Sequence, residues 1–269
     1  MSPEIMGGGY PRRSPPNLQV RRPAGEGSRE PMASISLSRR VATAARWPLG
    51  VGLTSWRYLW RTTPLSRREL GGDLDEHRAP EFPEDFDREG LQRPRGGAGP
   101  MFHRRYRIRI ADPKISAKDL METIRKDPDV FAPSEFATFE KAGDGDSDTI
   151  CRPGEEFVVR MPGPWDGPVR VVSVTDSCIR LATLEGHLEA GQIEFRAIEE
   201  DGLLVFTIES WARSSSRLTD LLYDRLRMAK EIQVHMWVSF LEHGTQRTGG
   251  RRRGCVEIRT RRVDEPPDA

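Results

Sequence analysis

The feature that most constrains the fold is a long amphipathic pattern near the carboxyl end of the chain. Ser214, Ser215 and Ser216 can cap a helix that we expect to run to about Glu242. Its apolar stripe consists of Leu218, Leu222, Leu226, Ala229, Met236 and Phe240, with Ile232 and Trp237 beside it. A one-sided helix of about seven turns must bury its apolar face against another long element.

Strand patterns precede this helix. Apolar and charged residues alternate from Tyr106 to Ile110, which is typical of a half-buried strand. Further strand patterns cover residues 157–161, 169–174, 178–184, 192–200 and 203–211. Asp201-Gly202 favours a tight hairpin between the last two, because both positions accept a positive φ. Such closely spaced strands predict an antiparallel meander.

Two short helices are expected between the first strand and the meander. Ser116, followed three residues later by Asp119, is a helix N-cap signature. Ser134 can cap a second short helix that runs through Phe139. The order of elements therefore predicts an α+β fold, in which a curved antiparallel sheet grips one long C-terminal helix.

Charge is distributed unevenly along the chain, although the formal net charge is only +1. Residues 1–68 carry 12 Arg and 3 acidic residues, whereas residues 69–100 carry 4 Arg and 9 acidic residues. The expected segments are a disordered N-terminus at 1–33, a basic-aromatic, helical extension at 34–68, an acidic Pro/Gly-rich connector at 69–100, a folded domain at 101–245 and a mostly flexible basic tail at 246–269. A short strand near Cys255–Ile258 is expected within the tail, and a translation start at Met32 instead of Met1 is left open.

Several protein classes are disfavoured by what the sequence lacks. No apolar run reaches the roughly 18 residues that a membrane-spanning helix needs. Cys151, Cys178 and Cys255 form no CxxC pair, which argues against a disulfide scaffold or a structural zinc site. No P-loop, GxGxxG, GxSxG or HExxH motif occurs. We therefore expect a cytoplasmic protein that uses no metal and no cofactor.

Four short segments carry a family resemblance. They are Phe102–Tyr106, Met161–Pro168, Ala182–Gly191 and Ser210–Arg213. With the element order, they make residues 101–245 resemble the START-like (SRPBCC, helix-grip) superfamily, and more closely a bacterial and plant branch known only as a domain of unknown function. The resemblance implies a hydrophobic cavity between sheet and long helix, usually occupied by a lipid-like or polyketide-like molecule, and it implies binding without implying catalysis.

The candidate ligand-binding residues lie on the long helix and on the sheet. Gln233 is polar in the middle of the apolar stripe, and small-molecule pockets are typically apolar with a few orienting polar groups. The candidates are Gln233, Trp237, Met236, Trp165, Phe195 and Phe206. The simpler interpretations are an amide bonded to a backbone carbonyl for Gln233 and ordinary core packing for Met236.

An enzyme of the cyclase or dehydratase type is the alternative to a binding protein. The candidate catalytic residues are Asp166, Glu185 and His187, at loops or strand ends of the same sheet. A histidine beside carboxylates can act as a general base. Glu185 and His187, however, flank Gly186 in an expected turn, where water would solvate both side chains.

The extension at 34–68 suggests a second kind of partner. It contains no acidic residue, and its candidate partner-binding residues are Arg39, Arg40, Trp47, Trp56 and Trp60. Arginine with tryptophan suits an anionic membrane surface, where each cation contributes about 1 kcal/mol. The simpler interpretation is a helix that packs on the body. Nucleic acid is disfavoured because no folded reading module surrounds the segment, and a protein partner is left open.

Overall fold

The computed structural model describes residues 63–73, 76–92, 94, 97–132, 137–142, 150–160, 166–215 and 228–263, and of residues 228–232 only the backbone. The chain divides into two units, Met1–Ser34 and Ile35–Ala269, and only the second contains described residues. All elements below belong to the second unit.

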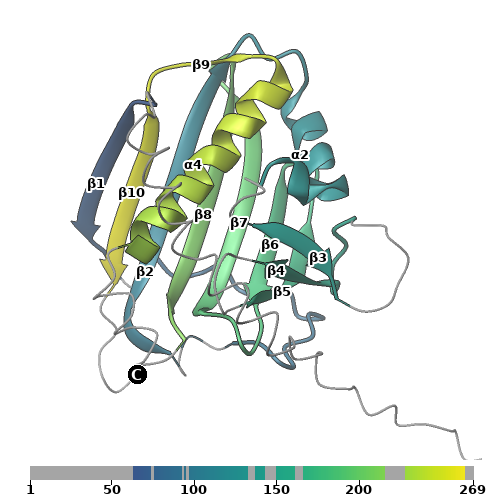
Figure 1. The fold of residues 1–269 in the computed structure, drawn as a ribbon, viewed down its shortest axis with the longest axis vertical. Helices are drawn as coiled ribbons and strands as arrows, with labels where there is room; N and C mark the ends of the chain where they lie inside the picture. The colour runs from purple at the N-terminus through teal and green to yellow at the C-terminus, as the bar shows by residue number, and fades with distance from the viewer. Residues whose placement is uncertain are drawn as a thin grey trace, which may run out of the picture. The chain divides into compact units, whose positions relative to one another are not determined.

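The body is built on one curved, mostly antiparallel sheet (Figure 1). Within the described residues it has ten strands. The strand order is β1 (Leu65–Gly71), β10 (Val256–Val263), β2 (Ala98–Ala111), β8 (Leu203–Ser214), β7 (Glu189–Glu200), β6 (Cys178–Thr183), β5 (Asp166–Val174), β4 (Glu156–Arg160) and β3 (Thr138–Lys141). The short β9 (Arg251–Arg252) pairs with the end of β2, and β1 runs parallel to β10.

The predicted meander is confirmed. Strands β4 to β8 follow one another along the chain, and each pairs antiparallel with the next. Asp201 and Gly202 form the hairpin between β7 and β8 with φ angles of 52° and 73°. The positive φ at both positions is the conformation that this dipeptide tolerates.

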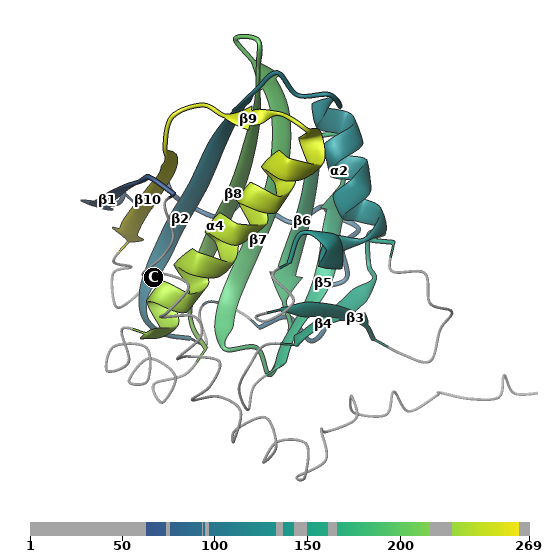
Figure 2. The same cartoon turned by 45° about the horizontal axis from the view of Figure 1, so that its top comes forward.

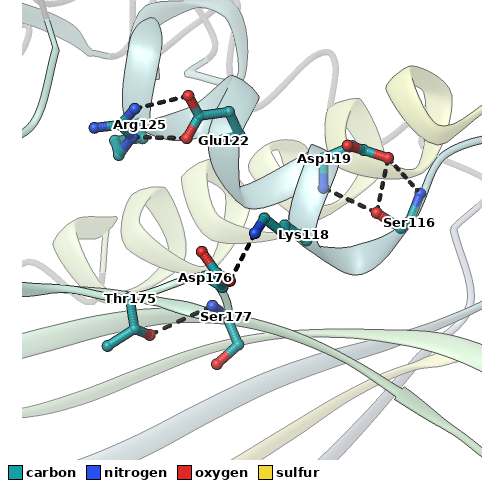
Figure 3. Close-up of polar contacts among 8 residues, drawn as sticks. All are labelled: Ser116, Lys118, Asp119, Glu122, Arg125, Thr175, Asp176 and Ser177. Atoms are coloured by element: carbon teal, nitrogen blue, oxygen red, sulfur yellow. Dashed lines mark hydrogen bonds and ion pairs between the residues drawn. The ribbon is translucent and has the colours of Figure 1, made fainter.

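The first predicted helix is confirmed as α2 (Ala117–Lys126), which is followed by the 3-10 helix η2 (Pro128–Val130). Ser116 Oγ accepts from the Asp119 amide at 3.1 Å, and the Asp119 carboxylate accepts from the Ser116 amide at 3.1 Å (Figure 3). This reciprocal capping box is the arrangement that the Ser–Asp spacing predicts. Lys118 pairs with Asp176 at 2.7 Å and connects α2 to the turn between β5 and β6.

The second predicted short helix is wrong at its carboxyl end, because Phe139 lies in edge strand β3. Phe139 pairs with Val159 of β4, and its side chain is buried in the main core. The cross-strand partner decides the conformation here, and it lies far along the sequence. Ser134 is outside the described residues.

The long helix α4 (Met228–Thr248) is described only from Met228 onward, because residues 216–227 lie outside the described part of the chain. Ser214 does not cap it, because Ser214 is the last residue of β8 and pairs with Ala98 and Glu189. The helix ends at Thr248, beyond Glu242. The stripe residues Leu218, Leu222 and Leu226 and the side chains of Ala229 and Ile232 are outside the described part of the chain.

Burial along α4 is not confined to one stripe, contrary to the amphipathic prediction. Val234, His235, Met236 and the whole run Val238–Leu241 are buried. The Nδ1 atom of His235 lies 3.1 Å from Ser239 Oγ on the next turn. Hydrogen bonding within the helix therefore accommodates polar side chains at buried positions.

Helix α4 crosses one face of the sheet over β2, β8 and β7 (Figures 1 and 2). We call this the inner face, and the opposite side the outer face. Alternate strand residues point inward and are buried with Phe240 and Leu241: Tyr106, Ile108, Ile110, Leu204, Phe206, Ile208, Phe195 and Ala197. Gly244 permits the close approach, since a Cβ there would lie 2.8 Å from Phe206 Cε1.

The outer face is partly covered by residues 76–92. Phe82 and Phe86 pack against a small cluster formed by Leu91, Val172, Ala182 and Leu184. Part of the expected exposed connector is therefore packed. No helix in the described ranges is long and apolar enough to cross a membrane.

Two further expectations are corrected at the other edge of the sheet. The predicted short strand in the tail is eight residues long, and β10 pairs with β1 on one side and β2 on the other. Val256, Ile258 and Thr260 are buried at every second position, so this segment is not flexible. Leu65–Arg68, the end of the extension expected to be helical, lies in β1.

Candidate ligand-binding site

An aromatic cluster lies between α4 and the inner face. The ring of Phe240 lies 5.1 Å from that of Phe195 and 6.2 Å from those of Phe206 and Trp237. Trp237 meets Phe195 edge to face at 5.7 Å. The structure thus brings together three of the predicted ligand-binding residues, with Phe240 as their common neighbour. Met236 is buried in the same core.

A polar cluster, consisting of Arg104, Glu189 and Gln233, lies toward the amino-terminal part of α4. Arg104 Nη1 lies 3.3 Å from Glu189 Oε1, and Gln233 Nε2 donates to Glu189 Oε2 at 3.1 Å. Arg104 is only 4% exposed although it is charged. The ring of Phe102 lies 4.7 Å from its guanidinium carbon, a cation–π contact.

Strand register explains how Arg104 and Glu189 meet. On β2, Arg104 is paired with Ser210 of β8, and on β7, Glu189 is paired with Ser214 of β8. The two charged residues therefore flank β8 and are offset along it by four residues, which is two inward-facing positions. Between them, β8 and β7 present only Ala212 and Gly191 to the inner face. No side chain fits at Gly191, because a Cβ there would lie 2.0 Å from the Trp211 carbonyl oxygen. These small residues leave room for the long arginine.

The inner face retains unused hydrogen-bonding capacity. Gln233 Oε1, Trp237 Nε1 and Ser210 Oγ are buried and have no hydrogen-bond partner among the residues that the structure describes. The simpler interpretation of Gln233 does not hold for its amide nitrogen, which is bonded to a carboxylate instead of a backbone carbonyl. Each buried polar group left unsatisfied costs about 1–3 kcal/mol, so such groups need an explanation.

The predicted catalytic residues do not form an acid–base pair. His187 Nδ1 accepts from the Glu189 amide at 2.9 Å, and a Cβ at Gly167 would lie 3.1 Å from His187 Nε2, so the ring packs against β5. Burial lowers the pKa of His187 below its ordinary value. Asp166 pairs with Arg160 at 2.6 Å, and Glu185 is exposed. Each side chain is occupied elsewhere or solvated.

Among the described residues, two buried cysteines have thiols that are not activated as nucleophiles. Burial raises the pKa values of Cys151 and Cys178 to about 12, so both thiols are protonated at neutral pH. Within the described ranges, no three His, Cys, Asp or Glu residues are grouped as a metal ion would require. Trp165 and the partner candidates Arg39, Arg40, Trp47, Trp56 and Trp60 lie outside the described residues.

Sequence reasoning missed Arg104 and Glu189. The alternation that runs from Tyr106 to Ile110 places Arg104 on the inner face when it is extended by two residues. On β7, extending the alternation by four residues from Ile193, past Gly191, reaches Glu189. The sequence alone can therefore indicate a charged residue on the inner face, but the contact between Arg104 and Glu189 becomes evident only from the pairing of the strands.

A second polar cluster lies on the outer face and serves to attach residues 76–92. His103 Nε2 lies 2.7 Å from a Glu209 carboxylate oxygen, and its ring stacks on Trp211 at 5.1 Å. His77 lies 5.2 Å from the His103 ring, with its Nε2 2.6 Å from Arg261 Nη1. Burial, and then the charge of Arg261, lower the pKa of His77. These contacts join two parts of the chain.

Comparison with known proteins gives a family match over part of the body. Residues 134–245, less than half of the chain, match the family model of a domain of unknown function, DUF1990. A search of curated proteins finds no sequence relative.

Solved structures with a similar fold include a protein from Helicobacter pylori, at 9% identity and a TM-score of 0.41 over 64% of this chain and 96% of that one. The di-domain ARO/CYC StfQ of the steffimycin biosynthetic pathway is similar at 10% identity and a TM-score of 0.41, over 58% of this chain and 52% of that one. A norcoclaurine synthase from Thalictrum is similar at 13% identity and a TM-score of 0.35, over 54% and 98%. At these levels neither enzyme is evidence for a shared activity. The chain is thus similar to the DUF1990 family over residues 134–245.

Proposed function

We propose that this protein binds an apolar small molecule between the inner face of its sheet and α4, in the manner of a START-like protein. The observation that carries the proposal is the buried polar cluster of Arg104, Glu189 and Gln233 beside an aromatic cluster, with polar atoms of Gln233 and Trp237 left unpaired. An apolar surface with a few polar groups is the usual character of a ligand site.

A purely structural role explains this arrangement less well. Removing an arginine and a glutamate from water costs more than their attraction returns unless the geometry is excellent, and well-packed apolar residues often replace such pairs without loss. The contact between Arg104 and Glu189, at 3.3 Å, is longer than a good charge-assisted hydrogen bond. The pair also contacts Gln233, and we propose that it holds this side chain in place for a ligand.

The aromatic cluster supplies the apolar part of the site. Phe195, Phe206 and Trp237 present rigid rings that lose little conformational entropy on binding. Burial of a methylene contributes about 0.8 kcal/mol, so a medium-length chain or a fused-ring ligand can reach micromolar affinity. An enzyme that uses His187 as its base is supported less well, because both carboxylates predicted to assist it are engaged or exposed.

Native purification of the full chain tests the proposal. An organic extract analysed by mass spectrometry should contain a co-purifying apolar compound, and fatty acids, sterols or polyketides should raise the melting temperature of the delipidated protein. If no compound co-purifies and none of these additives stabilises the protein, the proposal is wrong.

A matched pair of substitutions locates the site. Phe195→Leu replaces an aromatic ring on the inner face with a smaller apolar side chain. Phe82→Leu makes the same change in the apolar cluster on the outer face. We expect Phe195→Leu to weaken binding of the stabilising compound about tenfold and Phe82→Leu to leave it within about twofold, because distant sites act independently. Equal effects of the two substitutions would place the ligand elsewhere.

A further inference from the structure

We infer that the ligand carries a neutral hydroxyl group, held by Gln233 and Trp237 at the polar end of the inner face. The inference rests on the proposed function and specifies its ligand. It starts from the unpaired atoms Gln233 Oε1, Trp237 Nε1 and Ser210 Oγ.

The orientation of the Gln233 amide is fixed by Glu189. The amide nitrogen donates to Glu189 Oε2 at 3.1 Å, and the reverse orientation would place the amide oxygen against a carboxylate. Arg104 holds that carboxylate from the other side at 3.3 Å. Gln233 Oε1 is therefore an oriented acceptor that the surrounding described residues leave unused.

Trp237 provides a donor beside this acceptor. It follows Gln233 by four residues in α4, so the two side chains are neighbours on one helix face. Its ring is held edge to face against Phe195 at 5.7 Å, and its Nε1–H is buried without an acceptor in the described structure. An unused acceptor and an unused donor thus lie on adjacent turns, where the apolar and polar parts of the site meet.

A hydroxyl is the simplest group that satisfies both atoms, because it donates one hydrogen bond and accepts others. It would donate to Gln233 Oε1 and accept from Trp237 Nε1–H, and Ser210 Oγ offers a further partner of either kind. An ether can only accept, and an ammonium group can only donate. A carboxylate would add negative charge near Glu189, while the guanidinium of Arg104 is already engaged with Glu189. The chemistry selects an apolar alcohol or phenol.

Four naphthalenes with the same ring and different head groups test the inference: 2-naphthol, 2-methoxynaphthalene, naphthalene and 2-naphthoate. Binding to the delipidated full chain is measured by titration calorimetry. We expect 2-naphthol to bind about tenfold more tightly than naphthalene or the methyl ether, since two neutral hydrogen bonds contribute about that factor. This comparison needs no variant, so it does not depend on the folding of a mutant.

Gln233→Met removes the acceptor and keeps the length of the side chain. We expect it to reduce the preference for 2-naphthol over naphthalene to about twofold. Gln246→Met is the matched control, because Gln246 is an exposed glutamine on the same helix. The control should keep the full preference.

The possible results separate the two proposals. Equal affinity for 2-naphthol, the ether and naphthalene contradicts the inferred hydroxyl group but agrees with the proposed apolar site. Tightest binding of 2-naphthoate, or a full preference retained in Gln233→Met, also overturns it. If none of the four compounds binds and no compound co-purifies, the proposed function fails together with the inference.

Discussion

Two arginines, each 4% exposed, lie on opposite faces of the sheet and show what distinguishes the faces. On the outer face, Arg170 donates to the carbonyls of Asp87 and Glu89 at 2.8 Å and to the carboxylate of Glu156 at 3.0 Å. On the inner face, the contact of Arg104 with Glu189 leads to Gln233, whose amide oxygen is unpaired. The contacts of Arg170 attach a chain segment, whereas this contact of Arg104 leads to a side chain of α4.

Burial of a charge does not by itself indicate function. The groups to which the buried charge is hydrogen-bonded are more informative about function. Arg170 donates to backbone carbonyls within residues 76–92, so the protein's own chain covers this part of the outer face. The contacts beneath α4 end at atoms that a ligand can still satisfy.

The largest effect on stability is expected from Arg170→Met. The substitution leaves Glu156 and two carbonyls without their donor, so the free energy of unfolding should fall by about 3 kcal/mol. Urea denaturation followed by circular dichroism measures it. The affinity for 2-naphthol should stay within about twofold of wild type, because the inner face is untouched. Lost ligand affinity in the folded variant would contradict the division between the faces.

Arg104→Met should have a smaller effect on stability and a larger one on binding. It removes the ion pair with the half-buried Glu189, which we expect to cost about 2 kcal/mol and to release Gln233 from its fixed orientation. The double variant Arg104→Met with Glu189→Gln should recover most of the stability, since no buried charge remains, but not the preference for naphthol. Recovery of that preference would show that the ion pair does not orient Gln233.

Acidification should affect the outer-face attachment. Burial and Arg261 lower the pKa of His77, so between the folded-state pKa and the ordinary value of 6.5 the unfolded chain binds more protons than the folded protein. The stabilisation is complete above pH 6.5 and decreases as the pH falls below it. Because His187 also has a lowered pKa, His77→Gln should reduce the pH dependence of unfolding without abolishing it. An unchanged pH dependence in this variant would contradict the assignment to His77.

The smallest effect is expected from the exposed ion pair between α2 and the β5–β6 turn (Figure 3). Lys118 and Asp176 are both solvated, and water screens such pairs. Lys118→Met should leave the melting temperature unchanged within the error of differential scanning calorimetry. A clear decrease would show that the contact between α2 and the sheet depends on this pair.

The sequence predicts the local elements well, because alternation and capping are local signals. The hairpin at Asp201-Gly202 and the cap at Ser116 are examples. It predicts β3 and the full extent of β10 poorly. Phe139 becomes a strand residue through its pairing with Val159, and the arginines of β10 obscure the alternation of Val256, Ile258 and Thr260.

The candidate site is predictable only in part for the same reason. Gln233 is detectable because it interrupts an apolar stripe, and the structure places it beside the aromatic cluster through Trp237. The pair of Arg104 and Glu189 depends on the register of β2, β8 and β7, which one sequence does not specify. The acid–base trio of Asp166, Glu185 and His187 does not assemble, because Asp166 pairs with Arg160, His187 accepts from the Glu189 amide and Glu185 is exposed.

The position of β10 between β1 and β2 has a consequence for biosynthesis. Strand β2 leaves the ribosome long before its partner, so one edge of the growing sheet exposes unpaired amide and carbonyl groups until residues 256–263 have been translated. Only then can β1, which precedes the other described strands along the chain, join the sheet through β10. The nascent chain therefore passes most of its synthesis with an edge open to association with other chains.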